Sequence, residues 1–462
     1  MTKLNLKDVL KTPKGTRDLL PEEAAVWQKI EERAREVAEY YGFRPIRTPH
    51  IEHTELFTAS LGEASDVVEK QMYSFATRGH DKLTLRPEGT APIMRAYLEH
   101  GMRAWPQPVM LYYNGSFFRH ENPQRGRYRE LGQFGFEILG DESPVADAMI
   151  IWILTLVLKD LGIKNFTVRI NTLGDKECRG DYKKELVQYL RKKANYLCKD
   201  CKIRLKKNPL RVLDCKDPNC AEIKAGAPQT IEYVCAACKS HFKEVLEFLD
   251  ELGIPYLLDH SLVRGLDYYS RTVFEIFLDE KKPEEKKKKE EEKENAEIEV
   301  KESAEAAKGP EKAVPSIAIA GGGRYDYLGK MLSSKDIPAT GGAFGLDRLS
   351  DAVRELNINL GRKKAPKLFL IQLGSHAKKK SLSLAEEFRQ ANIPLAMSFS
   401  RDSIGSQLKI ASRLGVGYAV IIGQKEAFDE TAIVRNMEAG VQETIPLPRL
   451  LSYVKNKLKS KQ

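Results

Sequence analysis

The sequence predicts a mixed α/β protein of two or three domains, and three observations support this fold class. Its 462 residues exceed what one hydrophobic core usually organises. Strand-like segments dominate residues 73–140, whereas residues 367–462 alternate strand-like and helical segments. That alternation is typical of a small, mostly parallel sheet covered by helices. We therefore expect one large domain over residues 1–350, a linker at 351–366 and a second domain at 367–462.

The elements of the large domain follow from local patterns. Apolar residues at helical spacing predict a helix over residues 19–42, with Gly42 as its C-terminal cap. Residues 43–57 read as an extended, proline-containing segment that leads into a short helix. The further expected elements are strands at 82–87, 108–120 and 130–140, a helix at 144–161 and a strand at 166–171.

Two segments interrupt this domain. Residues 175–259 are rich in lysine and are expected to form an inserted, mainly helical module; six of the seven cysteines lie within residues 198–238. Residues 279–313 consist almost entirely of Glu, Lys and Ala and contain no aromatic residue. Such a composition cannot bury enough apolar surface to offset chain entropy. We therefore expect a disordered insertion in a hairpin loop, where its length costs little closure entropy.

Composition limits the class of protein. Hydrophobic residues at 42% and charged residues at 30% are typical of a globular protein, and the net charge of +10 is compatible with a nucleic-acid partner without indicating one by itself. The N-terminus lacks the apolar segment of a signal peptide. The apolar run Ala148–Leu158 is too short to span a bilayer. We expect a cytoplasmic enzyme without a membrane partner, whose cysteines do not form disulfides.

Polar residues occupy strand positions where a sheet normally buries apolar ones. Gln133, Gly135 and Glu137 are spaced by two and therefore share one face of a strand. A face of amide, glycine and carboxylate suits a small ligand that bears an ammonium group and a ring nitrogen. Glu88 and Thr90 repeat this spacing and are expected to line the same pocket.

A loop between two of these strands is rich in arginine. It also contains Glu121, and guanidinium groups bind phosphates and carboxylates in a fork geometry. The alternative is a hairpin whose solvated tip carries the charges. The arginines concerned are Arg119, Arg125, Arg127 and Arg129.

Three further stretches are unusual. "LVRGLDYYSRTVFE", residues 262–275, reads as a strand but contains Arg264, Asp267 and two adjacent tyrosines. "AGGGRYDYL", residues 320–328, ends a short apolar strand with three glycines, which permit close approach to a ligand. "GGAFGLDRL" places Arg348 near a helix start, where a phosphate can bind. The chain contains no P-loop.

Together these pieces resemble the three signature motifs of class II aminoacyl-tRNA synthetases, in the form found in the histidyl-tRNA synthetase family. "RTPHIEHTELF" resembles the dimer-interface motif, the segments from Leu85 and Phe118 the second motif, and "GGAFGLDRL" the third. The stretches at 262–275 and 320–328 resemble the two histidine-binding signatures. The resemblance implies an antiparallel catalytic sheet flanked by helices, and a C-terminal α/β anticodon-binding domain.

The resemblance also implies a function. Histidine would be activated with ATP to histidyl-adenylate and pyrophosphate, and the histidyl group would pass to the terminal ribose of tRNA-His. Mg²⁺ is expected to bridge the ATP phosphates, and the protein is expected to be a homodimer. The basic linker and the Lys- and Arg-bearing helices of the last domain fit contact with an RNA backbone.

Residue roles are implied by the same resemblance. Arg264 and Arg119 are the expected catalytic residues, because a preorganised cation stabilises the charge that develops as the carboxylate attacks. The residues expected to bind histidine are Glu88, Thr90, Gln133, Glu137, Tyr268 and Tyr269. The residues expected to bind ATP are Arg119, Glu121, Arg127, Arg264 and Arg348.

One departure and two alternatives accompany this hypothesis. Members of the family usually carry bulky residues just before the glutamine, whereas this chain has Leu131 and Gly132. Because Gly132 faces away from Gln133, we expect altered packing behind the pocket rather than lost binding. A regulatory paralogue without catalytic activity would typically lose the histidine signatures or the last domain, and both are present. A class I synthetase is supported only by "GKMLSS" at Gly329.

The cysteine spacing predicts a metal site. Two C-x-x-C pairs are typical of a structural zinc site. The expected ligands are Cys198, Cys201, Cys235 and Cys238, with Cys215 and Cys220 able to replace one pair. The alternative is a set of reduced, partly buried thiols. Cys178 is expected to be an ordinary core residue.

Overall fold

A large, mainly antiparallel sheet organises the first part of the chain. The computed structural model describes residues 10–62, 65–279, 318–360, 366–398 and 403–459. Within them, eight strands are ordered β1-β5-β6-β11-β10-β9-β7-β8, and only β1 and β8, at the edges, pair parallel to a neighbour. The strands are β1 (Arg44–Pro45), β5 (Val109–Phe118), β6 (Glu130–Leu139), β7 (Phe166–Thr172), β8 (Tyr256–Leu258), β9 (Ser270–Leu278), β10 (Ala318–Arg324) and β11 (Ala339–Gly345).

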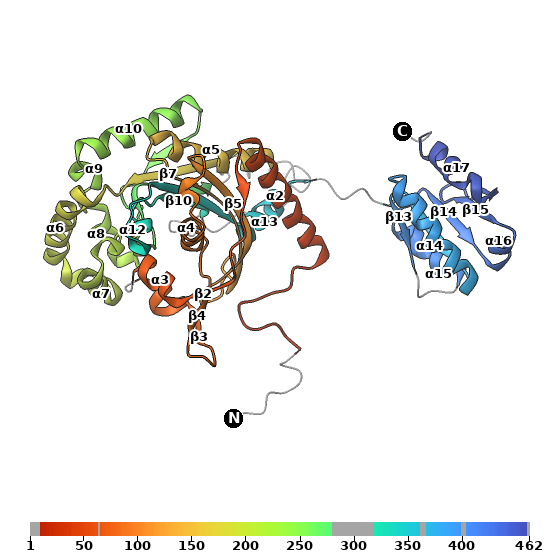
Figure 1. Cartoon of the computed structure of the whole chain (residues 1–462), viewed down its shortest axis with the longest axis horizontal. Coiled ribbons are helices and arrows are strands. Elements are labelled where there is room, and N and C mark those ends of the chain that lie inside the picture. The colour runs from red at the N-terminus through yellow and green to blue at the C-terminus, as the bar shows by residue number, and fades with distance from the viewer. Residues whose placement is uncertain (1–9, 63–64, 280–317, 361–365, 399–402, 460–462) are drawn as a thin grey trace, which may run out of the picture. The chain divides into compact units, whose positions relative to one another are not determined.

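Helices cover one face of this sheet (Figure 1). Phe134, Phe136 and Ile138 alternate with the polar residues of β6 and enter a core shared with α5. Helix α5 is apolar nearly all round because it is buried between the sheet and other helices. Its bounds confirm the helix predicted at 144–161. The helices on this face are α2 (Pro21–Tyr40), α5 (Pro144–Asp160), α10 (Ala236–Glu251) and α13 (Leu346–Glu355).

A smaller sheet projects from the body of this unit (Figure 1). Its order is β2-β4-β3, and Thr84 at its centre is buried. The short helix predicted after residues 43–57 begins earlier, as α3. The elements of this region are β2 (Ile51–His53), α3 (Thr54–Leu61), β3 (Tyr73–Ala76), β4 (Lys82–Leu85), α4 (Thr90–Glu99) and α12 (Leu328–Leu332).

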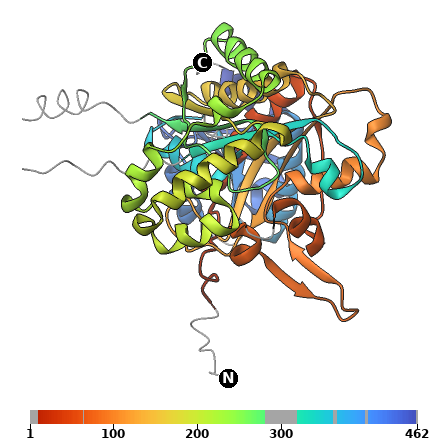
Figure 2. The same cartoon turned by 90° about the vertical axis from the view of Figure 1, so that its left-hand side faces the viewer.

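The inserted module is mainly helical, as predicted, and lies toward the viewer in Figure 2. Asp175 caps its first helix by accepting hydrogen bonds from the backbone amides of Glu177 and Cys178. Its helices are α6 (Lys176–Lys192), α7 (Lys199–Lys207), α8 (Ala221–Ala225), α9 (Thr230–Tyr233) and α10, with short 3₁₀ turns at Ala194–Tyr196, Pro209–Val212 and Pro218–Cys220.

The structure corrects the reading of residues 262–275. Residues 262–269 form a loop, and β9 begins only at Ser270. Arg264, Asp267 and both tyrosines therefore precede the strand. This explains why the stretch lacks alternating apolar and polar residues. The expected insertion at 279–313 lies outside the described residues, apart from Asp279.

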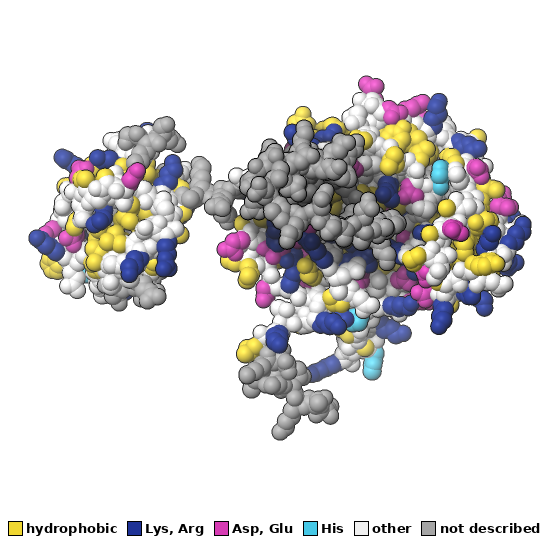
Figure 3. Space-filling view, turned by 180° about the vertical axis from the view of Figure 1, so that it is seen from behind, with side chains coloured by type: hydrophobic (Ala, Val, Ile, Leu, Met, Phe, Trp, Pro, Cys, Tyr) yellow, Lys and Arg dark blue, Asp and Glu magenta, His cyan; other side chains and the backbone are white. Residues whose placement is uncertain are grey.

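The chain divides into two compact units, Met1–Leu360 and Gly361–Gln462. The division falls within the linker expected at 351–366, although α13 extends to Glu355 and occupies its beginning. Lys and Arg side chains are spread over the visible face of each unit and do not gather in a single patch (Figure 3). No helix of the described residues has both the length and the apolar composition needed to cross a membrane.

The second unit is an α/β domain, but its sheet is mixed. Strands β13, β12 and β14 are parallel, as predicted, whereas β15 and β16 form an antiparallel hairpin at one edge. This hairpin was not predicted, because β16 is largely exposed and polar and so lacks the apolar residues that indicate a strand. The elements are β12 (Leu368–Gln372), α14 (Ser375–Gln390), β13 (Leu395–Met397), α15 (Ile404–Arg413), β14 (Tyr418–Ile422), α16 (Gln424–Phe428), β15 (Thr431–Asn436), β16 (Gln442–Pro446) and α17 (Leu447–Lys459).

We predict opposite effects of alanine at two glycines of the first unit. A Cβ atom on Gly132 would lie 2.4 Å from the ring of Trp27, so Gly132→Ala should destabilise the unit by about 1–3 kcal/mol. A Cβ atom on Gly180, inside α6, would meet nothing within 4 Å. Gly180→Ala should therefore stabilise by about 0.5–1 kcal/mol through helix propensity. Urea unfolding of the two variants measures both effects, and equal midpoints would contradict the packing argument.

Candidate active site

The face of the large sheet opposite the helices lacks large side chains at its centre. Gln133, Gly135 and Glu137 do share this face of β6, as their spacing predicted. On β11 they are paired with Gly345, Ala343 and Gly341 in register. On β10, Gly321 and Gly323 pair with these same positions of β11. The strands therefore form a floor of glycine and alanine from which Gln133 and Glu137 rise.

The glycines of this floor make room for particular side chains. A Cβ atom on Gly341 would lie 1.7 Å from Oε2 of Glu137, and one on Gly135 would lie 2.4 Å from the ring of Tyr113. A Cβ atom on Gly321 would lie 2.9 Å from Nη1 of Arg264. Since real Cβ atoms do not approach other atoms so closely, any larger residue would displace a side chain of the site.

Glu88 and Thr90 lie beside this floor, but not on a strand as their spacing suggested. They belong to the start of α4, where the Glu88 carboxylate accepts hydrogen bonds from the backbone amides of Thr90 (2.7 Å) and Ala91 (2.8 Å). The Thr90 hydroxyl donates to Oε1 of Glu137 (2.9 Å). The helix start therefore brings a second carboxylate next to the first.

Both carboxylates are almost completely buried. Burial away from water raises the pKa of Glu137 to about 8, in spite of hydrogen bonds from Tyr325 and Thr90. Burial also raises the pKa of Glu88 above its ordinary value. The negative charge of each carboxylate disfavours ionisation of the other. A bound cation would stabilise the ionised forms of both carboxylates, so this arrangement favours a cationic ligand.

The loop before β9 supplies two aromatic walls. The rings of Tyr268 and Tyr269 lie 4.7 Å apart, and both residues are buried. The Tyr268 hydroxyl donates to Oε2 of Glu88 (3.3 Å). Burial raises the pKa of both tyrosines, so both phenols are neutral hydrogen-bonding groups. The loop therefore connects the carboxylates to Arg264.

Arg264 stands between the tyrosines and the floor. Its guanidinium lies 5.6 Å from the centre of the Tyr269 ring and forms an ion pair with Glu275 of β9. Burial by itself lowers the pKa of Arg264, but the Glu275 charge together with Tyr269 and Tyr268 outweighs it and raises this pKa above the ordinary value. Arg264 is therefore a permanent cation held by a single carboxylate partner of the sheet.

Three more arginines lie at the other end of the floor. Arg119 donates from Nε to the backbone oxygen of Pro87 (2.7 Å), and Arg127 lies 3.6 Å from the Glu121 carboxylate. Arg348 donates from Nε to the Gly126 oxygen and from Nη1 to the Ala318 oxygen. Burial, followed by the positive charge of Arg127, lowers the pKa of Arg348. This concentration of positive charge suits an anion.

Sequence reasoning missed three residues of the site. Tyr325 donates to Oε2 of Glu137 from within the glycine-rich segment 320–328. Tyr113 of β5 covers Gly135 and Gly89, and Glu275 holds Arg264. A signal was available for Glu275, because it interrupts the apolar residues of β9. Arg125, in contrast, pairs with Glu355 and is exposed.

Gly132 lies behind the pocket, as expected. The Trp27 ring of α2 fills the space that a side chain on Gly132 would occupy. The backbone amide of Gly132 donates to Oδ2 of Asp347 (3.0 Å). Tryptophan on the helical face therefore fills the space beside this small residue, on the side of β6 opposite Gln133.

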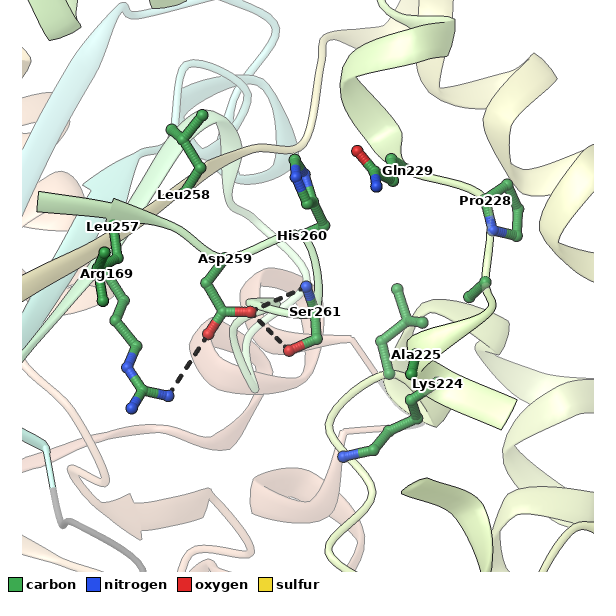
Figure 4. A pocket seen from close by; sticks show the side chains of 12 residues that line it. Arg169, Lys224, Ala225, Pro228, Gln229, Leu257, Leu258, Asp259, His260 and Ser261 are labelled. Atoms are coloured by element: carbon green, nitrogen blue, oxygen red, sulfur yellow. Dashed lines mark hydrogen bonds and ion pairs between the residues drawn. The ribbon is translucent and has the colours of Figure 1, made fainter. Parts of the chain in front are cut away.

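A separate hollow of about 380 Å³ lies between β8 and the inserted module (Figure 4). Two of the charged residues that line it, Arg169 and Asp259, form an ion pair at 3.7 Å. The Asp259 carboxylate also accepts hydrogen bonds from the amide and hydroxyl of Ser261. These groups satisfy one another, and none of the predicted site residues lines the hollow.

The structure corrects the expected set of cysteine ligands. The two C-x-x-C pairs do not converge; each belongs to a different group. The first, which we name the four-cysteine group, contains Cys198, Cys201, Cys215 and Cys220, so the latter two do replace a pair. The second, the aspartate–cysteine group, contains Asp175, Cys178, Cys235 and Cys238, so Cys178 is not an ordinary core residue. Within each group the candidate ligand atoms all lie within 4.8 Å of one another.

The antiparallel sheet and the residues gathered on its open face define the catalytic domain of a class II aminoacyl-tRNA synthetase. The family described as histidyl-tRNA synthetase matches residues 15–284, and the anticodon binding domain matches residues 367–457. The chain belongs to the histidyl-tRNA synthetase family.

Similar proteins cover nearly the whole chain. The histidine–tRNA ligase of Halothermothrix orenii is 40% identical over 96% of this chain and 98% of its own length. That of Natranaerobius thermophilus is 38% identical over 96% of this chain and 98% of its own length. The crystal structure of apo Staphylococcus aureus histidyl-tRNA synthetase has a TM-score of 0.74 at 32% identity, covering 96% of this chain and 99% of that one.

We predict a pH-dependent cost of burying Glu137. Its pKa is about 8 in the folded protein and near 4.5 when unperturbed, so the folded state retains a proton that the unfolded chain releases. Stability should therefore fall as the pH rises from 4.5 to 8. Glu137→Gln, which resembles the protonated acid, should remove this contribution. In urea unfolding, the free energy of unfolding of Glu137→Gln should rise relative to that of the wild type between pH 5 and pH 8. If the two free energies change with pH in parallel, the raised pKa is wrong.

Proposed function

We propose that this histidine–tRNA ligase binds histidine over the glycine floor of the large sheet, between the buried carboxylates and the two tyrosines. The observation that carries the proposal is the pair of buried carboxylates, Glu88 and Glu137, neither of which forms an ion pair with Lys, Arg or His among the described residues, although the charge of Arg119 acts on Glu88. An ammonium group would compensate their charge, and the neutral phenols offer hydrogen bonds to an imidazole. The residues proposed to bind histidine are Glu88, Thr90, Gln133, Glu137, Tyr268 and Tyr269.

ATP is proposed to bind at the arginine-rich end of the same floor. Guanidinium groups bind phosphate oxygens through paired hydrogen bonds, and the Glu121 carboxylate beside Arg127 helps to place the nucleotide. Mg²⁺ would bind together with the ATP phosphates and neutralise part of their charge. The Glu121 carboxylate offers the oxygen ligands that Mg²⁺ prefers. The residues proposed to bind ATP are Arg119, Glu121, Arg127, Arg264 and Arg348.

Arg264 is the proposed link between the two substrates. It lies between the tyrosines and the ATP end of the floor, and exchange of its Glu275 partner for substrate oxygens would place it between the histidine carboxylate and the α-phosphate. The carboxylate oxygen attacks the α-phosphorus, a P–O bond to pyrophosphate breaks, and negative charge accumulates on the phosphoryl oxygens. Arg264 and Arg119 stabilise that charge without covalent participation. A ribose hydroxyl of tRNA then attacks the histidyl carbonyl, and AMP leaves.

The second unit is proposed to bind the anticodon of tRNA-His. It belongs to the anticodon-binding domain family, and its Lys and Arg side chains can contact phosphates. On the face visible in Figure 3 they do not gather in one patch, which is compatible with recognition that depends on base contacts as well as charge. The free state of the seven cysteines supports the expected cytoplasmic location.

The regulatory-paralogue alternative is disfavoured by what the chain retains. Arg264, Tyr268, Tyr269 and Arg348 all lie at the proposed pocket, and the last domain is present. A protein that only sensed histidine would need the carboxylates and tyrosines, but it would have no use for the arginines of the ATP end.

The protein is proposed to be a homodimer through the small sheet. In the β2-β4-β3 register, Ile51, Tyr73, Phe75, Leu83 and Leu85 lie on one face, opposite the buried Thr84. Ile51 and Phe75 are 45% and 44% exposed, which is high for large apolar side chains gathered on one face. Of this face, β2 with Ile51 lies within the motif that resembles the class II dimer interface, residues 47–57.

We predict that Arg264→Ala nearly abolishes histidine activation. The purified protein should exchange labelled pyrophosphate into ATP with histidine and with no other amino acid, in the absence of tRNA. Loss of one preorganised charge-stabilising group should lower the exchange rate by about 10²–10³-fold. Arg33→Ala removes the same charge from an exposed position of α2 and should leave the rate unchanged. If folded, ATP-binding wild-type protein shows no exchange, the proposed activity is wrong.

We predict that a charge on the small sheet separates the dimer. Phe75→Glu should convert the protein to a monomer in light scattering coupled to gel filtration, because a buried interface cannot accommodate an unpaired carboxylate. Tyr196→Glu, at a 72% exposed aromatic residue of the inserted module, is the matched control and should remain dimeric. A dimer that survives Phe75→Glu would exclude this face as the interface.

A further inference from the structure

We propose that the inserted module holds two structural Zn²⁺ ions, one in the four-cysteine group and one in the aspartate–cysteine group, and that the second ion fixes the module to α5 and to the tyrosine-bearing loop of the proposed histidine site. The existence of the two sites is independent of the proposed function. Only their effect on histidine binding depends on it.

The four-cysteine group has the dimensions of a zinc site. The Sγ atoms of Cys198 and Cys215 lie 3.7 Å apart. Four thiolates at 2.3 Å from a central ion, in tetrahedral geometry, are about 3.8 Å from one another. The group is assembled from the start of α7 and the two 3₁₀ turns that follow, and Cys201, Cys215 and Cys220 are buried. All four sulfurs lie within 4.8 Å of one another, so small side-chain adjustments would bring them to this geometry.

The aspartate–cysteine group is similarly compact. Sγ of Cys238 lies 3.9 Å from Sγ of Cys178 and 3.0 Å from Oδ2 of Asp175. Sγ of Cys235 lies 3.7 Å from the same carboxylate oxygen. Three sulfurs and one carboxylate oxygen form an acceptable tetrahedral set for Zn²⁺. The other carboxylate oxygen, Oδ1, is already engaged as the cap of α6.

Backbone amides point at the sulfurs in both groups. The amides of Cys201 and Asp217 lie 3.4 Å from Sγ of Cys198 and Cys215, respectively. The amide of Asp175 lies 3.3 Å from Sγ of Cys178. Amide hydrogens directed at sulfur stabilise thiolates, and outer hydrogen bonds of this kind accompany metal ligands generally.

Ordinary packing does not account for the second group. Asp175 is only 7% exposed and is surrounded by three thiols. Within the described part of the chain, no Lys, Arg or His forms an ion pair with it; the charge of Arg179 acts on it from a distance, and only Oδ1 is bonded as the cap of α6. Its neighbour Lys176 is paired with Asp336 instead. A divalent cation bound to the three sulfurs would place a positive charge directly beside Oδ2, which faces the sulfurs of Cys235 and Cys238.

The second group joins the beginning and the end of the module. Cys178 and Cys238 are 60 residues apart, on the first turns of α6 and α10. Each of these helices contacts the catalytic domain, one at the loop before β9 and the other at α5. Arg179 of α6 donates to the backbone oxygen of Tyr269, and His241 of α10 lies 2.8 Å from the buried Asp147. An ion here would hold both contacts in place by closing the loop between them.

The first group orders a different contact with the site. The segment that follows α7 contains Asn208, whose side-chain amide donates to Asp267 in the loop before β9 (2.9 Å). Arg211 in the same segment pairs with Asp66 (2.6 Å). The first ion would therefore act on this loop through Asp267, and the second through Tyr269.

Metal content of the full-length protein tests the proposal without reference to activity. Protein purified in reducing buffer, without chelator, should contain two equivalents of zinc per chain by mass spectrometry of the elements. Cys198→Ser/Cys201→Ser and Cys235→Ser/Cys238→Ser should each contain one. A wild-type content of one or none, with zinc supplied during expression, would overturn the proposal, as would loss of both ions from either double variant that remains folded.

A milder variant serves if the double variants do not fold. Asp175→Asn keeps an oxygen for the helix cap but removes the anionic ligand, so a chromogenic chelator should extract one of the two ions at least about tenfold faster. Asp217→Asn is the matched control, because Asp217 caps a 3₁₀ turn of the same module through its side chain and is not a ligand. Co²⁺ in place of zinc should give thiolate charge-transfer absorption in wild-type protein. Equal extraction from both variants, or no such absorption, would contradict the second site.

The link to the histidine pocket has its own measurement. In pyrophosphate exchange, Asp175→Asn should raise the KM for histidine about tenfold under chelating conditions, while the KM for ATP changes little. Zinc restored in excess should reverse the effect. If both KM values change together, or if neither responds to zinc, the ion does not position the histidine pocket, whatever the zinc content.

Discussion

The site depends on one constraint: the centre of the large sheet has almost no side chains on its open face. Glycine weakens a strand because it loses more backbone entropy on folding than other residues do, and because it has no side chain to pack. Here that cost makes space that larger residues would fill. Glu137 occupies the position where a Cβ atom of Gly341 would stand, and the Tyr113 ring lies over Gly135. Without these glycines neither the buried carboxylates nor Arg264 could lie against the sheet.

The opposite face stabilises the strands that the open face weakens. Phe134, Phe136 and Phe344 pack against one another between the sheet and the helices. A buried ion-pair network completes this support, since Arg324 at the end of β10 lies 2.9 Å from Asp147 of α5, which also contacts His241 of the module. Breaking such a network leaves an uncompensated buried charge and is strongly destabilising. The catalytic strands, their covering helix and the inserted module are therefore held in one arrangement.

Local patterns predicted some parts of the site and missed others for a consistent reason. The period of two along β6 correctly placed Gln133, Gly135 and Glu137 on one face, because strand geometry alone determines that relation. The same spacing was misleading for Glu88 and Thr90, which lie at a helix start. The two C-x-x-C pairs were correct as local units, but no spacing rule states which distant cysteines approach each pair. Tyr325 and Glu275 were missed because their roles depend on partners from other strands or the loop before β9.

The sequence by itself determined the two-part organisation, the helical character of the inserted module, the polar face of β6 and, through its motifs, the family. These features depend on periodicity, composition and short-range chemistry, which are properties of contiguous residues. Only the tertiary structure decided that Arg264 pairs with Glu275, that the cysteines form two groups, that Trp27 fills the space beside Gly132, and that the edge hairpin of the second unit exists. The cysteine groups and the Trp27 contact depend on segments far apart in the chain, whose separation is set by the packing of the core. The Arg264–Glu275 pair and the edge hairpin lie closer in sequence, but their residue pattern does not state which side chains or strands pair.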